Sequence, residues 1–199
     1  KSMSPIVRNL NEDFAHVLHV VSSQRFLNKQ GLGNEVPFFI CPYPAPQAID
    51  AEKHIRLLGK KLQAKGVQVL EINLYDLSIE LLKRREIFAT ILEQEQDYSK
   101  AELKELLQGV LDLIPAIAAT LAETAYDVLF ITGVGAVFPY IRSHNVLNNL
   151  QSTAKEKPTI MFFPGTYEHS LETGASLDLF GKLHDDKYYR AFNIFHYEV

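Results

Sequence analysis

Apolar and polar residues are distributed along this chain in blocks that predict buried strands separated by amphipathic helices. Four short runs are rich in apolar residues and match strands covered on both faces; they comprise residues 36–41, 67–74, 127–132 and 158–163. Prolines follow two of these runs, so we expect the first to end at Pro42 and the fourth at Pro164-Gly165. Weaker strand candidates lie at residues 174–180 and 192–195.

Between the strands, apolar residues recur every three or four positions, which is the spacing of one helix face. An N-terminal helix is predicted over roughly residues 6–24, and a clearer one carries apolar residues at positions 48, 51, 55, 58 and 62. Gly66 stands where the C-cap of that second helix is expected. A further helix follows residue 74. Ser99 with Glu102 forms a capping box that opens the next, which Pro115 should kink or split. The last predicted helix covers about residues 138–151.

This alternation is typical of an α/β fold, because parallel strands are joined by crossover helices that cover both faces of the sheet. We therefore predict a three-layer α/β/α sandwich with a mainly parallel sheet, formed by one domain over residues 1–199. The arrangement resembles a degenerate P-loop NTPase core. Its third strand ends in Thr132, where such an enzyme would usually carry an acidic residue for magnesium.

Amino-acid composition and net charge argue against several classes of protein. The apolar share of 47% is enough for a sizeable core, and the formal net charge of −4 argues against a dedicated duplex-DNA binder. A single cysteine, Cys41, excludes an intramolecular disulfide and a cysteine-based zinc site. The sequence contains neither a membrane-length apolar stretch nor the apolar core of a signal peptide, so we expect a soluble cytoplasmic protein.

Ligands of this fold class bind at the carboxyl ends of the strands, which points to four loops: residues 42–47, 74–78, 133–138 and 164–170. The first is where a P-loop enzyme would bind phosphate. Here it contains Pro42, Pro44 and Pro46, which lack N–H groups, and it has neither glycine nor lysine. We therefore expect no ATP hydrolysis, no enzymatic activity and no cofactor.

The turn Gly133-Val134-Gly135 follows the third strand but lacks the third glycine of a dinucleotide-binding fingerprint. It has two interpretations. In the one we favour, it is a tight turn in which at least one glycine has φ > 0. In the other, it forms an anion site at a helix N-terminus, with Arg142 and His144 nearby.

The other chemistry-bearing residues are scattered, and we predict no metal site. His184 and the two aspartates after it lack a second histidine-bearing helix, and His169 beside Ser170 lacks a nucleophile elbow. The basic run at 83–85 spreads over most of a helical turn and is interpreted as a solvated face. Cys41 is expected to be a buried, unreactive thiol.

Three segments together resemble one protein family. They read TGVGAVFPYIRSH at residues 132–144, FFPGTY at 162–167, and LF at 179–180 followed by DKYYRAFNI at 186–194. In order and spacing they are similar to the BrxB family of bacteriophage exclusion (BREX) defence systems. The resemblance implies an accessory subunit with no assigned catalytic activity. In such systems it works beside an alkaline-phosphatase-like protein (PglZ), an AAA+ ATPase (BrxC) and an adenine methyltransferase (PglX).

Our leading hypothesis is a non-catalytic assembly or adaptor subunit of an intracellular anti-phage complex, binding first of all the PglZ-type protein. Its candidate contacts include Tyr188, Tyr189 and Arg190, in an aromatic segment of which we expect at least half to be core. Arg142 and Arg190 are expected to serve the fold before they serve binding. The alternative is a nucleotide or anion sensor without hydrolysis that binds at residues 133–144. Direct nucleic-acid binding through residues 83–85 is the least favoured hypothesis.

Overall fold

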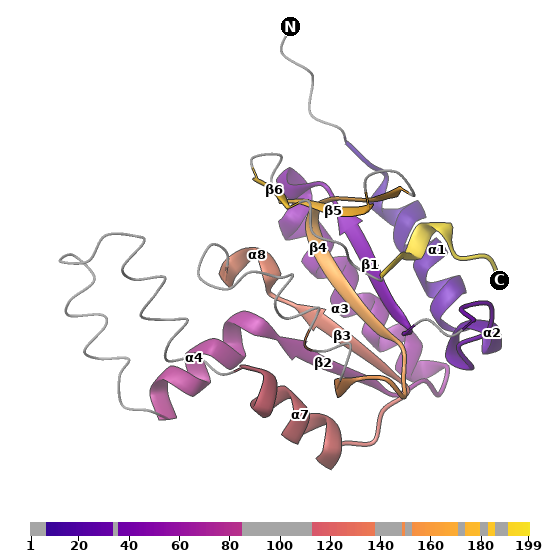
Figure 1. Cartoon of the computed structure of the whole chain (residues 1–199). Coiled ribbons are helices and arrows are strands. Elements are labelled where there is room, and N and C mark those ends of the chain that lie inside the picture. The colour runs from indigo at the N-terminus through magenta and orange to yellow at the C-terminus, as the bar shows by residue number, and fades with distance from the viewer. Residues whose placement is uncertain are drawn as a thin grey trace, which may run out of the picture.

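The computed structural model describes residues 7–33, 36–84, 113–137, 149, 153–170, 174–179, 183–185 and 191–199. Within them, five strands form an all-parallel sheet in the order β2-β3-β4-β1-β7 (Figure 1). The strands are β1 (Phe38–Tyr43), β2 (Val69–Asn73), β3 (Val128–Thr132), β4 (Thr159–Ser170) and β7 (Phe192–Asn193). The four predicted strands are therefore confirmed as parallel neighbours.

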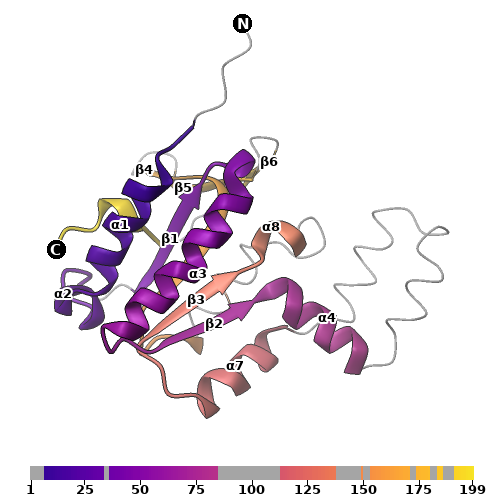
Figure 2. The same cartoon turned by 180° about the vertical axis from the view of Figure 1, so that it is seen from behind.

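Helices pack on both faces of this sheet, because successive strand residues point to opposite sides and both sides are apolar. One face is covered by α4 (Leu74–Arg84), α7 (Leu113–Glu123) and α8 (Val134–Val137). The other is covered by α1 (Leu10–Val21), α2 (Gln24–Leu27) and α3 (Ala48–Ala64). Figure 2 shows α1 and α3 side by side over this second face. The prediction of an α/β fold is confirmed.

The first strand runs past the proline predicted to end it. β1 continues through Pro42 to Tyr43 and keeps its parallel pairing with β4 to that point. On its other side, β1 pairs with β7 through Phe39 and Ile40, and no other described residue pairs with β1 along that edge. A proline is tolerated at an edge because no ladder hydrogen bond needs its missing N–H group.

The fourth strand also continues, through Pro164 and Gly165 to Ser170, and it changes its partner at this point. Up to Pro164 it pairs in parallel with β1, and from Gly165 it pairs antiparallel with β5 (Gly174–Leu179). β5 pairs in turn with β6 (Leu183–Asp185). The Pro-Gly pair thus marks the place where the strand leaves the parallel sheet and not the place where it ends.

Three further boundaries are corrected. The predicted N-terminal helix is broken at Ser22 and Ser23, where the Ser23 side chain accepts the N–H of Phe26 at 3.2 Å and caps α2. The helix after β3 begins at Val134, earlier than predicted. Of the strand candidate at 192–195 only β7 is a strand, and the 3-10 helix η2 (Ile194–His196) follows it. The capping box at residues 99–102 and residues 138–148 lie outside the described residues.

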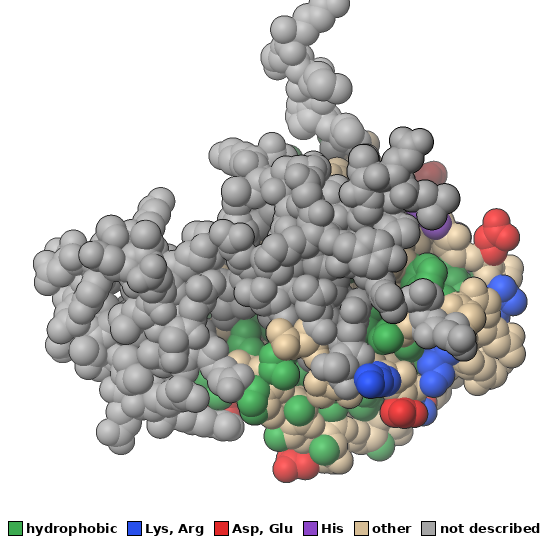
Figure 3. Space-filling model, in the orientation of Figure 1, with side chains coloured by type: hydrophobic (Ala, Val, Ile, Leu, Met, Phe, Trp, Pro, Cys, Tyr) green, Lys and Arg blue, Asp and Glu red, His purple; other side chains and the backbone are tan. Residues whose placement is uncertain are grey.

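The surface over α7 is apolar in the view of Figure 3, where hydrophobic side chains gather on this helix and the turn after it. Small side chains produce this surface, since Ala118, Ala122 and Ala125 line a shallow hollow there together with Leu121 and Tyr126. None of the described helices has the length and apolar character needed to cross a bilayer.

Candidate functional site

A cavity of about 500 Å³ lies at the carboxyl ends of β1 to β4, beside the first half of α3. Each of the four loops singled out from the sequence contributes to its wall, through Tyr43, Tyr75, Gly133 and Pro164. This is the edge at which parallel α/β sheets bind their ligands. The four loops therefore meet around one cavity, as their place at the strand ends predicts, and the chemistry of this cavity depends on the side chains that line it.

A carboxylate is held in place on one wall of the cavity. The Thr132 hydroxyl, at the end of β3, donates to Oε1 of Glu71 at 2.7 Å. Alternation along β2 points Glu71 to the α3 side of the sheet, and the β2–β3 register brings the two side chains together. Sequence reasoning missed Glu71. The available signal was the single carboxylate of a largely apolar strand, next to the strand that ends in Thr132.

At the floor of the cavity, the main chain at Gly133 lies so close to Asn73 that only glycine fits. Gly133 has a φ of 71°, in the left-handed region. A Cβ atom there would come within 2.2 Å of Oδ1 of Asn73. That same oxygen accepts the N–H of Asp76 at 3.1 Å and caps the start of α4. The tight-turn interpretation of Gly133 is confirmed, while Gly135 lies within α8.

The side of the cavity formed by α3 and β1 carries ionisable groups. Burial raises the pKa of Tyr43, and the negative charge of Glu52 raises it further, so this phenol stays protonated. Arg56 follows Glu52 by one helical turn and lines the same cavity. Neither Glu52 nor Arg56 forms an ion pair with another described residue.

This lining is poorly suited to a phosphate group. Two carboxylates, Glu52 and Glu71, face the cavity with one guanidinium, that of Arg56, so the described lining side chains carry a net negative charge. The chain after β1 enters the 3-10 helix η1 (Ala45–Gln47) through Pro44, and Pro46 follows. Since prolines have no N–H to offer, this loop cannot form the amide nest that a phosphate requires.

Cys41 lies near this edge of the sheet but is not part of the site. Its side chain is 1% exposed, and burial raises the pKa of its thiol, with a smaller rise from Asp13. A thiol that stays protonated is a weak nucleophile. The prediction of a buried cysteine is confirmed, and its low reactivity stays a prediction that the raised pKa supports.

Only two of the predicted contact residues lie in the described part of the chain. Gly133 and Gly135 both line the cavity. Arg142, His144, Tyr188, Tyr189 and Arg190 lie outside the described residues, so their expected roles stay predictions. The same holds for Asp186 and Arg85, whereas His184 and Asp185 belong to β6 and His169 and Ser170 end β4.

Three aromatic residues of the C-terminal segment are partly buried at the margin of the core. Phe192, Phe195 and Tyr197 pack against the apolar cluster beneath α1 and α2. Tyr197 makes edge contacts with the rings of Phe26 and Phe39, at centroid distances of 5.7 and 5.6 Å. The expectation that at least half of the five aromatics are core is therefore met only in part, because these three are partly buried, and Tyr188 and Tyr189 stay predicted contacts.

Comparison with known proteins agrees with the resemblance seen in the sequence. The family described as "BREX protein BrxB" matches residues 70–194. A BREX protein BrxB of Bacillus cereus (strain H3081.97) is 32% identical over 195 residues, covering 94% of this chain and 98% of the relative. A BREX protein BrxB of Escherichia coli O9:H4 (strain HS) is 30% identical over 177 residues, covering 87% and 86%.

No solved structure matches the chain. The predicted likeness to a P-loop NTPase core is therefore not supported by any known fold, and the proline-containing loop after β1 gives it no support either. The fold is described by its own elements, as a five-stranded parallel sheet with helices on both faces and an antiparallel extension from β4.

Proposed function

Because this chain belongs to the BrxB family of BREX proteins, we propose that it is a non-catalytic assembly or adaptor subunit of a phage-defence complex. In this proposal it binds a larger BREX component inside the cell. The PglZ-type protein is the first candidate, and the ATPase BrxC and the methyltransferase PglX are the others. The family match over most of the chain is the observation that carries the proposal.

The geometry of the cavity supports an adaptor over an enzyme. The polar residues at the strand ends already serve the fold: Asn73 caps α4, Thr132 binds Glu71, and Gly133 lies against Asn73. The Asn73 amide oxygen, which already caps α4, is therefore not free to bind a substrate. The proposal therefore assigns the protein's contribution to its surface.

The test is affinity purification from a strain that carries the complete defence locus, with this chain tagged at its native level of expression. We expect the PglZ-type protein to co-elute in a stable ratio while the tagged strain still resists phage. If the strain resists phage and no BREX protein co-elutes at low salt, the adaptor proposal is wrong.

A second candidate function is a small-ligand sensor, and the cavity of about 500 Å³ is the observation that favours it. The sequence suggested nucleotides and anions as ligands, but Glu52 and Glu71 make neutral and cationic compounds the better probes. A thermal-shift screen with nucleotides, phosphate, nucleosides and polyamines tests it. A ligand at about 100 times its Kd adds about 2.7 kcal/mol of stability. A flat response across all four classes eliminates the sensor.

A further inference from the structure

The outward face of α3 carries apolar and basic residues in one stripe. Ile49, Lys53, Leu57 and Lys60 follow one another at intervals of four, four and three, which places them on one side of the helix. All four are exposed, with Ile49 at 73% and Leu57 at 46%. The residues Ala51, Ile55, Leu58 and Leu62 occupy the opposite side and are buried against the sheet.

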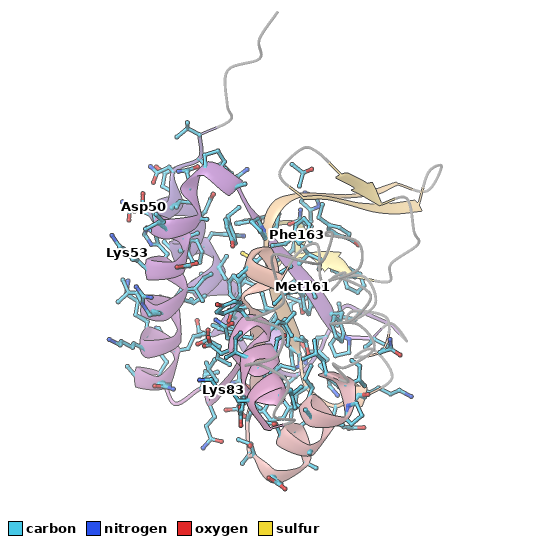
Figure 4. The ribbon with its side chains drawn as sticks, turned by 90° about the vertical axis from the view of Figure 1, so that its left-hand side faces the viewer. Asp50, Lys53, Lys83, Met161 and Phe163 are labelled. Atoms are coloured by element: carbon cyan, nitrogen blue, oxygen red, sulfur yellow. The ribbon has the colours of Figure 1, made fainter. Side chains whose placement is uncertain are left out.

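Figure 4 shows how this stripe lies relative to the core. Lys53 points away from the body of the protein on α3, as does its neighbour Asp50, whereas Met161 and Phe163 lie within the sheet. The two lysines of the stripe form no ion pair with another described residue. No residue of α3 three or four positions from Lys60 is acidic. Asp50 is exposed and lies three positions before Lys53, so one carboxylate borders the stripe. With two lysines the stripe is still net basic, on a chain whose formal net charge is −4.

The helix dipole explains only part of this pattern. Cations in the last turn are stabilised by the negative end of a helix, which accounts for Lys61. Lys53 lies in the first half of α3, where the dipole offers a cation nothing. The dipole also does not explain why two large aliphatic side chains, Ile49 and Leu57, are exposed on the same side of the helix as the lysines.

A third apolar residue lies at the start of the same helix. The main-chain N–H of Arg8 donates to Oε1 of Gln47 at 2.9 Å, and Nε2 of Gln47 donates back to the Arg8 carbonyl at 2.9 Å. These bonds hold Arg8 beside the residue before α3, and Val7, which is 77% exposed, directly precedes Arg8. Two of the five large exposed hydrophobic residues in the described part of the chain, Ile49 and Leu57, lie on the stripe itself.

We propose that the outer face of α3 is a docking surface for an acidic, amphipathic segment of a partner protein. The inference rests on the proposed adaptor function and names the surface that function would use. Carboxylates of such a segment would pair with Lys53 and Lys60, and its apolar side chains would cover Ile49 and Leu57. A nucleic-acid backbone satisfies the lysines equally well, but it gains nothing from the aliphatic residues between them. The alternation of lysines and aliphatic residues therefore favours a protein segment over nucleic acid as the binding partner.

The experiment co-expresses the tagged chain with the other proteins of its defence locus and measures which of them it captures. Lys53→Glu with Lys60→Glu is compared with Lys155→Glu and Lys157→Glu, an equal change of charge at exposed lysines before β4. Leu57→Asn is compared with Val199→Asn, since these residues are 46% and 48% exposed. All four variants should melt like the wild type, because surface substitutions change stability little.

We expect the α3 charge reversal and Leu57→Asn each to reduce capture by about tenfold, and both controls to match the wild type. Capture by the wild type should also weaken from about 0.1 M to about 1 M salt, as screening increases. Equal capture by wild type and α3 variants overturns this surface and leaves the adaptor proposal intact. A wild type that captures no BREX protein overturns both. If a duplex DNA probe binds, is lost on charge reversal and is unaffected by Leu57→Asn, the occupant is nucleic acid and the inference is wrong.

Discussion

At the scale of single residues, Gly133 is the position where the fold depends on one missing side chain. Gly133→Ala places a Cβ in the left-handed region and against Oδ1 of Asn73, so the cap of α4 must move. We expect a loss of about 2–3 kcal/mol of unfolding free energy, from backbone strain and the weakened cap. Chemical denaturation of the two proteins measures it.

The matched control for this change is Gly59→Ala. Gly59 lies in the middle of α3, and a Cβ there meets no atom within 4 Å. That substitution should stabilise the protein by about 0.5–1 kcal/mol, because alanine is the better helix former. In the background of Asn73→Ala, Gly133→Ala should cost less, because the atom that it would meet is gone. Equal costs in both backgrounds would contradict the proposed contact.

Cys41 makes a residue-scale prediction about pH. Burial raises the pKa of this thiol in the folded protein above its unfolded value of 9.0. Above that pH the unfolded chain binds fewer protons than the folded one, so stability falls as pH rises. From pH 8 to pH 10 this group alone should remove about 1 kcal/mol. Urea unfolding of wild type and Cys41→Ala at the two pH values measures the difference. If both proteins lose the same stability, the folded thiol ionises.

At the scale of elements, the last residues of the chain act as a clamp on α2 and the loop after it. The Tyr197 hydroxyl lies within hydrogen-bond distance of the carbonyl oxygens of Arg25 and Gln30 and donates to them. Nε of Arg25 donates to the Glu198 carbonyl at 3.0 Å. Tyr197→Phe should lower stability by about 1 kcal/mol, since it removes the hydroxyl and leaves the ring contacts.

Tyr75→Phe is the control for that substitution. Tyr75 is 46% exposed, and its hydroxyl has no hydrogen-bond partner among the described residues. Its removal should leave the denaturation midpoint unchanged. A Tyr197→Phe protein as stable as Tyr75→Phe would show that the C-terminal segment is held by its rings alone.

At the scale of the whole molecule, the two apolar clusters on either side of the sheet make one cooperative unit through β3. Leu129 is fully buried and lies between β2 and β4 in the sheet. Leu129→Asp should unfold the protein, because an unpaired buried charge costs several kcal/mol and native domains are stable by only about 5–15 kcal/mol. Circular dichroism and gel filtration would detect it. Ala119→Asp, at an exposed position on α7, should fold normally.

The sequence by itself determined the parallel strands, the helices between them and several of their ends. These features depend on interactions over a few residues, and local patterns record them. Gly66 illustrates the point. Spacing alone predicts it at the helix C-cap, and in the structure its φ is 82° and its N–H donates to the Gln63 carbonyl. The family was likewise readable from three motifs, and the comparisons confirm it.

Contacts between residues far apart in the sequence became known only from the tertiary structure. Thr132 and Glu71 are 61 positions apart, and only the β2–β3 register brings them together. The sequence predicts the end of a strand at Pro164-Gly165, because it does not show that β5 replaces β1 as the partner there. The spacing of apolar residues predicts whether a segment is a helix or a strand, but which strand it pairs with depends on the packing of the whole chain. That is why the fold was largely predictable here and the walls of the cavity and the exposed stripe on α3 were not.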